Sequence, residues 1–146
     1  MKLKQLSVFL ENRPGALSAP CRLLAKAGIS IQTFSLADSE EFGLLRLIVA
    51  DIRRAQRLLQ REGFVVKVTE IVVLEVPDLP GGLATVLDAL EGTGINLEYA
   101  YAFTKKHRGR GLLAFRFDKP DAAIKALKAH KIDTVGTKEL FRRLEC

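Results

Sequence analysis

The stretch LENRPGALSAP, Leu10–Pro20, decides the expected fold, because a variant of it returns as VPDLPGGLATV, Val76–Val86. In each copy a strand-like run stops at Pro-Gly and helical spacing follows. Proline cannot keep donating to a ladder, and glycine accepts unusual dihedral angles. Gly28-Ile29-Ser30 and Gly94-Ile95-Asn96 repeat at the same offset of 66 residues. Separate anchors in one register indicate an internal repeat, which governs any prediction of the fold.

Both copies predict the same order of elements. Alternating apolar residues predict strands and 3.6-residue spacing predicts helices, with the first helix starting no earlier than Ala16 because of Pro20. The expected strands are 3–10, 29–37, 43–50, 64–68, 71–76, 97–103 and 113–117, and the expected helices are 16–27, 52–62, 83–90 and 120–127. Residues 132–144 are ambiguous, with a short strand expected near 133–136 and an irregular or helical tail.

The order strand-helix-strand-strand-helix-strand, written twice, predicts an α+β protein. We expect two ferredoxin-like βαββαβ units side by side, each an antiparallel sheet with its helices on one face. The boundary is expected at Thr69-Glu70, which gives domains of residues 1–69 and 70–146.

Composition narrows the class of protein. The chain has 146 residues, is 48% hydrophobic, and lacks a run of 18 uncharged apolar residues, so no membrane segment is expected. The two cysteines, Cys21 and Cys146, have neither metal-ligand nor disulfide-framework spacing, so we expect a cytoplasmic protein. The net charge of +6 permits an anionic partner without requiring one.

The repeated loop has the chemistry of an anion site. The first amides of a helix lack intrahelical partners and carry the positive end of its dipole. Gly15 and Gly81-Gly82 keep side chains away from that backbone, and Asn12 and Asp78 occupy equivalent positions where a side-chain oxygen can cap the helix or hold the loop. Pro-Gly is also ordinary turn chemistry, so the loop alone leaves a structural and a functional role open.

Two stretches resemble ACT domains, the small-molecule-binding regulatory modules of amino-acid metabolism. They are LENRPGALSAPCRLLAKAGISIQTFSLADSEEFGLLRLIVAD and EVPDLPGGLATVLDALEGTGINLEYAYAF, the second followed by GLLAFRFDK. The resemblance implies that amino acids bind at the seam between units, where the first loop of one meets the second strand of its neighbour. The residues it implies for binding are Asn12, Arg13, Gly15, Ala16, Leu17, Ser30, Ile31, Asp78, Leu79, Gly81, Gly82, Leu83, Asn96 and Leu97.

The two implied sites differ in chemistry. The Asn12 loop facing Asn96 offers two amides, whereas the Asp78 loop facing Ser30 places a carboxylate where a ligand carboxylate would be repelled. We therefore expect unequal sites, with tighter binding at Asn12 and Asn96. Arg13 is either a solvated charge or a carboxylate partner, and Ile31 and Leu97 would set side-chain selectivity.

Other functions have weaker support. RGLLAFRF, Arg110–Phe117, half-matches an RNA-recognition signature, but Leu112 and Ala114 stand where stacking aromatics are needed. His107 and His130 have no triad-like context, so we expect no enzyme activity and no catalytic residues, cofactor or metal. The expected partners are a free amino acid and a separate metabolic enzyme or second copy, without nucleic acid or membrane. A subunit that docks on an enzyme without any ligand remains an alternative.

Overall fold

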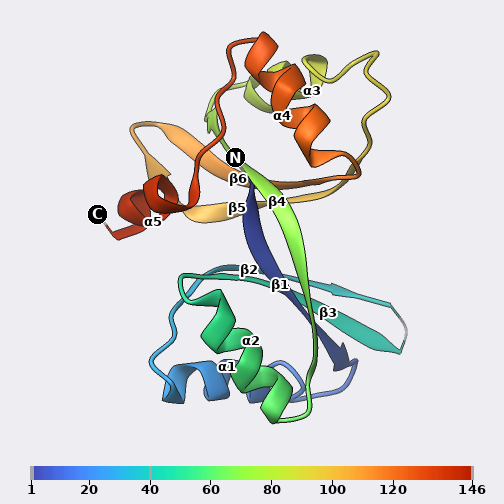
Figure 1. Ribbon diagram of the computed structural model, residues 1–146, viewed down its shortest axis with the longest axis vertical. Helices are drawn as coiled ribbons and strands as arrows, with labels where there is room; N and C mark the ends of the chain where they lie inside the picture. Colours follow the sequence, from blue (N-terminus) through green and yellow to red (C-terminus); the bar gives the residue numbers. More distant parts are fainter. Residues whose placement is uncertain (1, 40, 146) are drawn as a thin grey trace. The chain divides into compact units, whose positions relative to one another are not determined.

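The computed structural model describes residues 2–39 and 41–145, and Cys146 lies outside them. The chain divides into two compact units (Figure 1): Lys4–Thr69, which we call the first unit, and Met1–Leu3 with Glu70–Cys146, the second unit. The elements are β1 Leu3–Glu11, α1 Ser18–Lys26, β2 Ile31–Asp38, β3 Phe42–Val49, α2 Ile52–Arg61, β4 Val65–Pro77, α3 Gly82–Asp88, β5 Leu97–His107, β6 Arg110–Phe117, α4 Pro120–Ala129 and α5 Thr137–Glu145.

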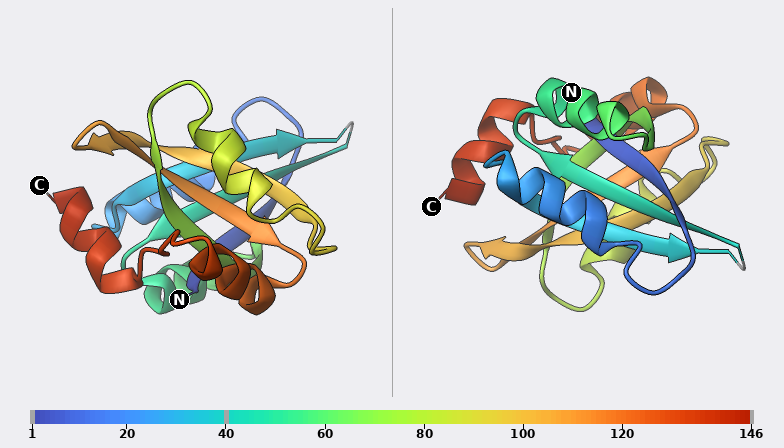
Figure 2. Two further views of the ribbon diagram at one scale, coloured as in Figure 1. Left: turned by 90° about the horizontal axis from the view of Figure 1, so that it is seen from above. Right: turned by 90° about the horizontal axis from the view of Figure 1, so that it is seen from below.

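The first unit has the strand order β2-β3-β1-β4. Leu47 of β3 lies opposite Leu6 of β1 and Phe34 of β2 in antiparallel register. Helices α1 and α2 lie on one face of this sheet (Figures 1 and 2). This arrangement confirms the predicted α+β class. The core between the two layers consists of Leu6, Val8, Leu10, Leu24, Ile29, Leu45, Leu47, Val49, Ala55 and Leu59.

The helix ends of the first unit follow local chemistry. Pro20 is the third residue of α1, where a missing N–H costs no intrahelical bond. Gly28, with a φ of +72°, ends that helix in the left-handed conformation. Helix α2 begins after Asp51, whose side-chain oxygen accepts a hydrogen bond from the Arg54 amide at 3.2 Å. Residues close in sequence therefore determine where these helices begin and end.

The second unit has the order β4-β6-β5, with Leu74 of β4 opposite Leu113 of β6 and Ala100 of β5 opposite Phe115. Helices α3 and α4 lie on one face (Figures 1 and 2), and Pro120 occupies the first turn of α4. The core consists of Val72, Leu74, Val76, Val86, Ala89, Leu90, Phe115, Phe117, Ala123 and Leu127. Both units therefore have the predicted antiparallel sheets with two helices on one face.

Residues 132–144, which the sequence leaves ambiguous, form a β-bridge and most of the helix α5. The expected short strand is a single antiparallel bridge between Thr134 and Leu74, beside a 2.8 Å bond from the Val135 amide to the Val73 carbonyl. The tail is the helix α5, with Leu140 fully buried. Lys105 of β5 donates to the Leu144 carbonyl at 2.7 Å. Helix α5 is therefore held to the second unit by burial and by polar contacts.

Several element boundaries differ from the sequence prediction. Strands β5 and β6 extend over 97–107 and 110–117 instead of 97–103 and 113–117, and α1 begins at Ser18 instead of Ala16. Strands expected at 64–68 and 71–76 are one strand, β4, because the run from Val65 to Val76 is rich in β-branched residues and contains neither glycine nor proline. Helix α3 ends at Asp88, although Ala89 and Leu90 remain buried. None of the described helices is both long and apolar enough to cross a bilayer.

Candidate functional site

The loop between β1 and α1 is tied to the β2–β3 hairpin by Asn12. Its backbone N–H donates to the Glu41 carbonyl at 3.1 Å, and its Nδ2 donates to the Ser39 carbonyl at 3.1 Å. The residue that caps α1 is Leu17, which makes no side-chain capping bond. Asn12 is therefore not the N-cap residue of α1, and its amide nitrogen ties the loop to the hairpin.

Backbone amides of this loop are already engaged within the protein. The Ala16 amide donates to the Arg13 carbonyl at 3.2 Å, and the Ser18 amide donates to the Gly15 carbonyl at 3.1 Å. Gly15 has a φ of +82° and open space where a Cβ would stand, so its conformation rather than crowding calls for glycine. An anion at this loop has to use donors other than the Ala16 and Ser18 amides.

Four predicted residues of the first loop share one small hollow of about 80 Å³. This volume holds a few water molecules, whereas sites that enclose small ligands occupy about 300 Å³ or more. Arg13, on its rim, pairs with the Glu11 carboxylate at 2.7 Å, and both side chains are exposed. The lining residues are Leu10, Glu11, Asn12, Arg13, Ala16, Leu17, Leu36, Asp38 and Gly43.

The second loop repeats the backbone bonds of the first. The Asp78 amide donates to the Gly109 carbonyl at 3.2 Å, as Asn12 does to Glu41 in the other copy. The Gly82 amide donates to the Leu79 carbonyl at 3.0 Å, as Ala16 does to Arg13. The N-cap residue of α3 is Gly81, with a φ of +86°.

Gly82 has a packing reason to be glycine. A Cβ placed on it would stand 2.1 Å from the Pro77 carbonyl oxygen. The side chains of Leu79 and Leu83 are 71% and 46% exposed, so neither contributes to the core. The glycine at this position lets the start of α3 approach β4, which is a structural role.

The predicted strand-start residues lie away from the loops of their own units. Ile31 faces Val49 at one end of the β2–β3 pair, whereas the Asn12 loop follows Glu11 at the other end of the sheet. Leu97 faces Phe117, whereas the Asp78 loop follows Pro77 at the end marked by Arg110. Ser30 and Asn96 are exposed, and the Asn96 backbone is held by Asp118. Within one unit, loop and strand start are therefore not brought together.

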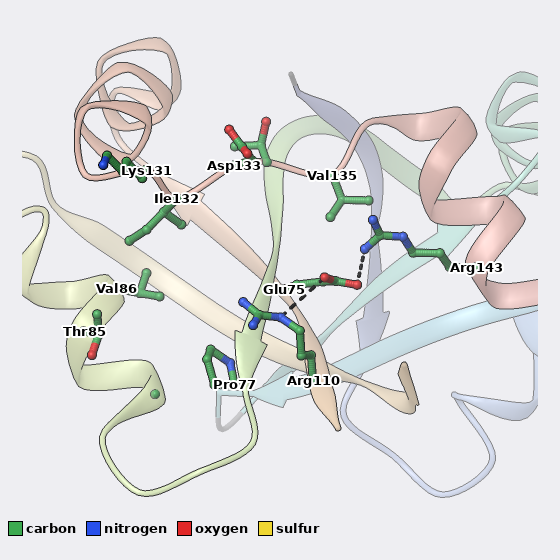
Figure 3. A pocket seen from close by; sticks show the side chains of 12 residues that line it. Glu75, Pro77, Thr85, Val86, Arg110, Lys131, Ile132, Asp133, Val135 and Arg143 are labelled. Atoms are coloured by element: carbon green, nitrogen blue, oxygen red, sulfur yellow. Dashed lines mark hydrogen bonds and ion pairs between the residues drawn. The ribbon is translucent and has the colours of Figure 1, made fainter. Parts of the chain in front are cut away.

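A larger cavity of about 400 Å³ lies in the second unit (Figure 3). Of the predicted residues it includes only Gly82. Its lining joins the end of β4, the start of α3, the first residue of β6, the 131–135 segment and α5. The lining residues are Glu75, Pro77, Gly82, Thr85, Val86, Arg110, Lys131, Ile132, Asp133, Thr134, Val135 and Arg143.

Glu75 is the charged centre of this cavity. Its carboxylate pairs with the Arg110 Nε at 3.5 Å and with Nη1 of Arg143, and the side chains of Glu75 and Arg143 are 20% and 19% exposed. Arg143 also contacts Glu139, one turn earlier on α5, at 2.7 Å. Hydrogen bonds from Arg142 and then Arg143 lower the pKa of Glu139 to about 2. Glu75 therefore lies between two guanidinium groups.

Sequence reasoning missed these groups because Glu75 and Arg143 are far apart in the chain. The i, i+3 and i, i+4 spacing of Glu139 with Arg142 and Arg143 was the available signal for a helical tail. In the described part of the chain, no group of His, Cys, Asp or Glu is arranged to hold a metal. Leu112 and Ala114 are each 1% exposed, so they offer no surface on which a base could stack.

Comparisons with known proteins agree with the duplicated architecture. A family model described as an ACT domain pair matches residues 1–144. The crystal structure of protein BT0572 from Bacteroides thetaiotaomicron is similar at 35% identity, with 97% of each chain covered and a TM-score of 0.89. The ligand-free regulatory subunit of aspartate kinase from Thermus thermophilus has 17% identity, covers 86% of this chain and 91% of its own, and has a TM-score of 0.62. No curated protein matches the sequence.

Proposed function

This chain belongs to the ACT domain pair family, and we propose that it is a non-catalytic regulatory protein that senses a free amino acid and modulates a partner. The match of the paired-domain family over residues 1–144 carries the proposal. The fold shared with a regulatory subunit of aspartate kinase supports a regulatory role. The partner in this proposal is a separate metabolic enzyme or a second copy of the chain.

We assign amino-acid binding to the repeated loops and the strand starts. The matching backbone bonds of Asn12 and Asp78 support equivalent roles for the two loops. The hollow at the first loop is too small to enclose an amino acid, and loop and strand start lie at opposite ends of each unit. We therefore propose that each ligand is bound by the loop of one copy and the strand start of the other. Asn12 and Asn96 form the tighter of the two sites.

A second candidate function is docking on a partner without a ligand. It is favoured by large apolar side chains that the first unit leaves exposed. Phe9, Phe34, Leu36 and Phe42 are 45%, 57%, 48% and 55% exposed. Of these, Phe9 and Phe42 line one open hollow, and exposed apolar side chains that lie together in this way are typical of protein-binding surfaces.

A thermal-shift screen against the twenty amino acids separates the two candidates. A ligand at 100 times its Kd adds about 2.7 kcal/mol to the free energy of unfolding, which gives a clear shift. Asn96→Ala should weaken binding of the identified ligand about tenfold, the value of one good hydrogen bond, because among the described residues only the Asn96 backbone is engaged. Gln60→Ala, on the exposed face of α2, is the matched control. A flat response to all twenty amino acids would favour docking alone.

A further inference from the structure

The cavity of the second unit exists because this unit lacks the last strand of the βαββαβ pattern. In the first unit β4 runs beside β1 as a full strand, whereas in the second unit that position is reduced to the bridge at Thr134. Among the described residues, this pairing does not continue along Glu75–Pro77. The 131–135 segment instead passes over that edge of β4 and encloses about 400 Å³. The cavity is therefore a feature of the second copy, in which part of the repeated stretch Val76–Val86 meets the 131–135 segment and α5.

Arg110 brings a partly unused guanidinium group into this space. Its Nε lies 3.5 Å from Glu75, and no described residue accepts a hydrogen bond from its two terminal nitrogens. Figure 3 shows these nitrogens turned from Glu75 toward the space between Pro77 and Val86. A guanidinium presents its N–H groups in a planar fork that matches the two oxygens of a carboxylate. The free side of Arg110 is thus suited to a carboxylate ligand.

The charge balance favours an anion over a zwitterion. Glu75 is shared by Arg110 and Arg143, and the charged side chains of the lining, three cations and two acids with Lys131 and Asp133 included, sum to +1. Lys131 and Asp133 are both drawn well apart from Arg110 (Figure 3). An α-ammonium group lies beside its carboxylate, so binding through Arg110 would place it near two guanidinium groups and a Glu75 carboxylate that both of them already engage. A ligand without an ammonium group avoids this repulsion.

The remaining walls are partly apolar and partly polar, since Thr85, Asp133 and Thr134 also line the cavity. Pro77, Val86, Ile132 and Val135 line the cavity, and the total volume lies within the range of sites that bind small organic molecules. We propose that this cavity binds a small carboxylate with an aliphatic body and no ammonium group through the guanidinium of Arg110, and a 2-oxo acid serves as the probe. The site borders the second loop, with which it shares Gly82, but its anchor Arg110 is not among the residues assigned to the amino acid.

Calorimetric titration with leucine and with 4-methyl-2-oxopentanoate, which share a side chain, tests this assignment. The oxo acid should bind at least tenfold more tightly than leucine at this site. Arg110→Gln should weaken oxo-acid binding at least tenfold, and Arg110→Lys, which keeps the charge but loses the fork, should also weaken it. Arg108→Gln removes a charge from the exposed turn next to β6 and is the matched control, with a change under twofold.

The outcomes distinguish this site from the proposed amino-acid site. Asn96→Ala should leave oxo-acid binding intact, and Arg110→Gln should leave any amino-acid response intact. Amide resonances of Val86, Ile132 and Val135 should move when the oxo acid is added, which places the ligand even if a variant is unstable. Absence of oxo-acid binding, or equal loss in Arg108→Gln and Arg110→Gln, would overturn the assignment.

Discussion

Gly82→Ala probes the close approach between the start of α3 and the end of β4. The new Cβ would stand 2.1 Å from the Pro77 carbonyl oxygen, although real contacts essentially never fall under 3.0 Å. Pro77 is held in the ladder opposite Arg110, so its carbonyl cannot turn away freely. Overpacking of this kind costs about 3 kcal/mol at the upper end, and the better helix propensity of alanine returns about 1 kcal/mol. The expected net loss is about 2 kcal/mol.

Urea unfolding and thermal melting followed by circular dichroism measure this loss. For a chain of this size, about 2 kcal/mol lowers Tm by roughly 4–8 °C. The matched control is Ala16→Gly, at the equivalent position of the first copy, where the methyl group is already accommodated. That change should cost about 0.5–1 kcal/mol through the entropy of the unfolded chain. A Gly82→Ala protein within about 0.5 kcal/mol of the parent would show that the reasoning from this contact is wrong.

The other predictions concern two helices. Asp51→Ala removes the oxygen that caps α2 at the Arg54 amide and should lower the free energy of unfolding by about 1 kcal/mol, seen as a lower urea midpoint, with Asp51→Asn nearly neutral. The pKa of Glu139 is lowered from 4.5 to about 2, so its stabilising contribution is complete above pH 4.5 and is lost as the pH falls toward 2. Urea midpoints measured across this range should fall less steeply in Glu139→Gln than in the parent, and identical slopes would contradict the pairing with Arg142 and Arg143.

The repeated loop and the cavity have different origins in the fold. The loop follows from duplication, since Asn12 and Asp78 make the same backbone bond to the neighbouring hairpin. The cavity follows from divergence of the second copy, where a bridge at Thr134 replaces the closing strand. We propose an amino acid at the loops and an organic acid in the cavity. The variants Asn96→Ala and Arg110→Gln test the two sites separately.

The sequence by itself determined the repeat, the class of fold and most helix and strand positions. Pro20, Gly28 and Asp51 act on the dihedral angles and hydrogen bonds of their own neighbours, so their effects can be predicted locally. Strand 65–77 was divided in the prediction because a repeat copy was expected to end at Thr69, whereas the backbone offers no residue that stops the strand there.

Only the tertiary structure decided which distant side chains meet. Glu75 and Arg143 are joined by the position of α5, and Gly82 meets Pro77 because α3 turns back against the strand it follows. The Asn12 amide nitrogen meets the Ser39 carbonyl because the fold brings the β2–β3 hairpin to this loop. Such pairings depend on strand register and helix packing. Many residues together determine both, so no single sequence motif predicts which side chains meet.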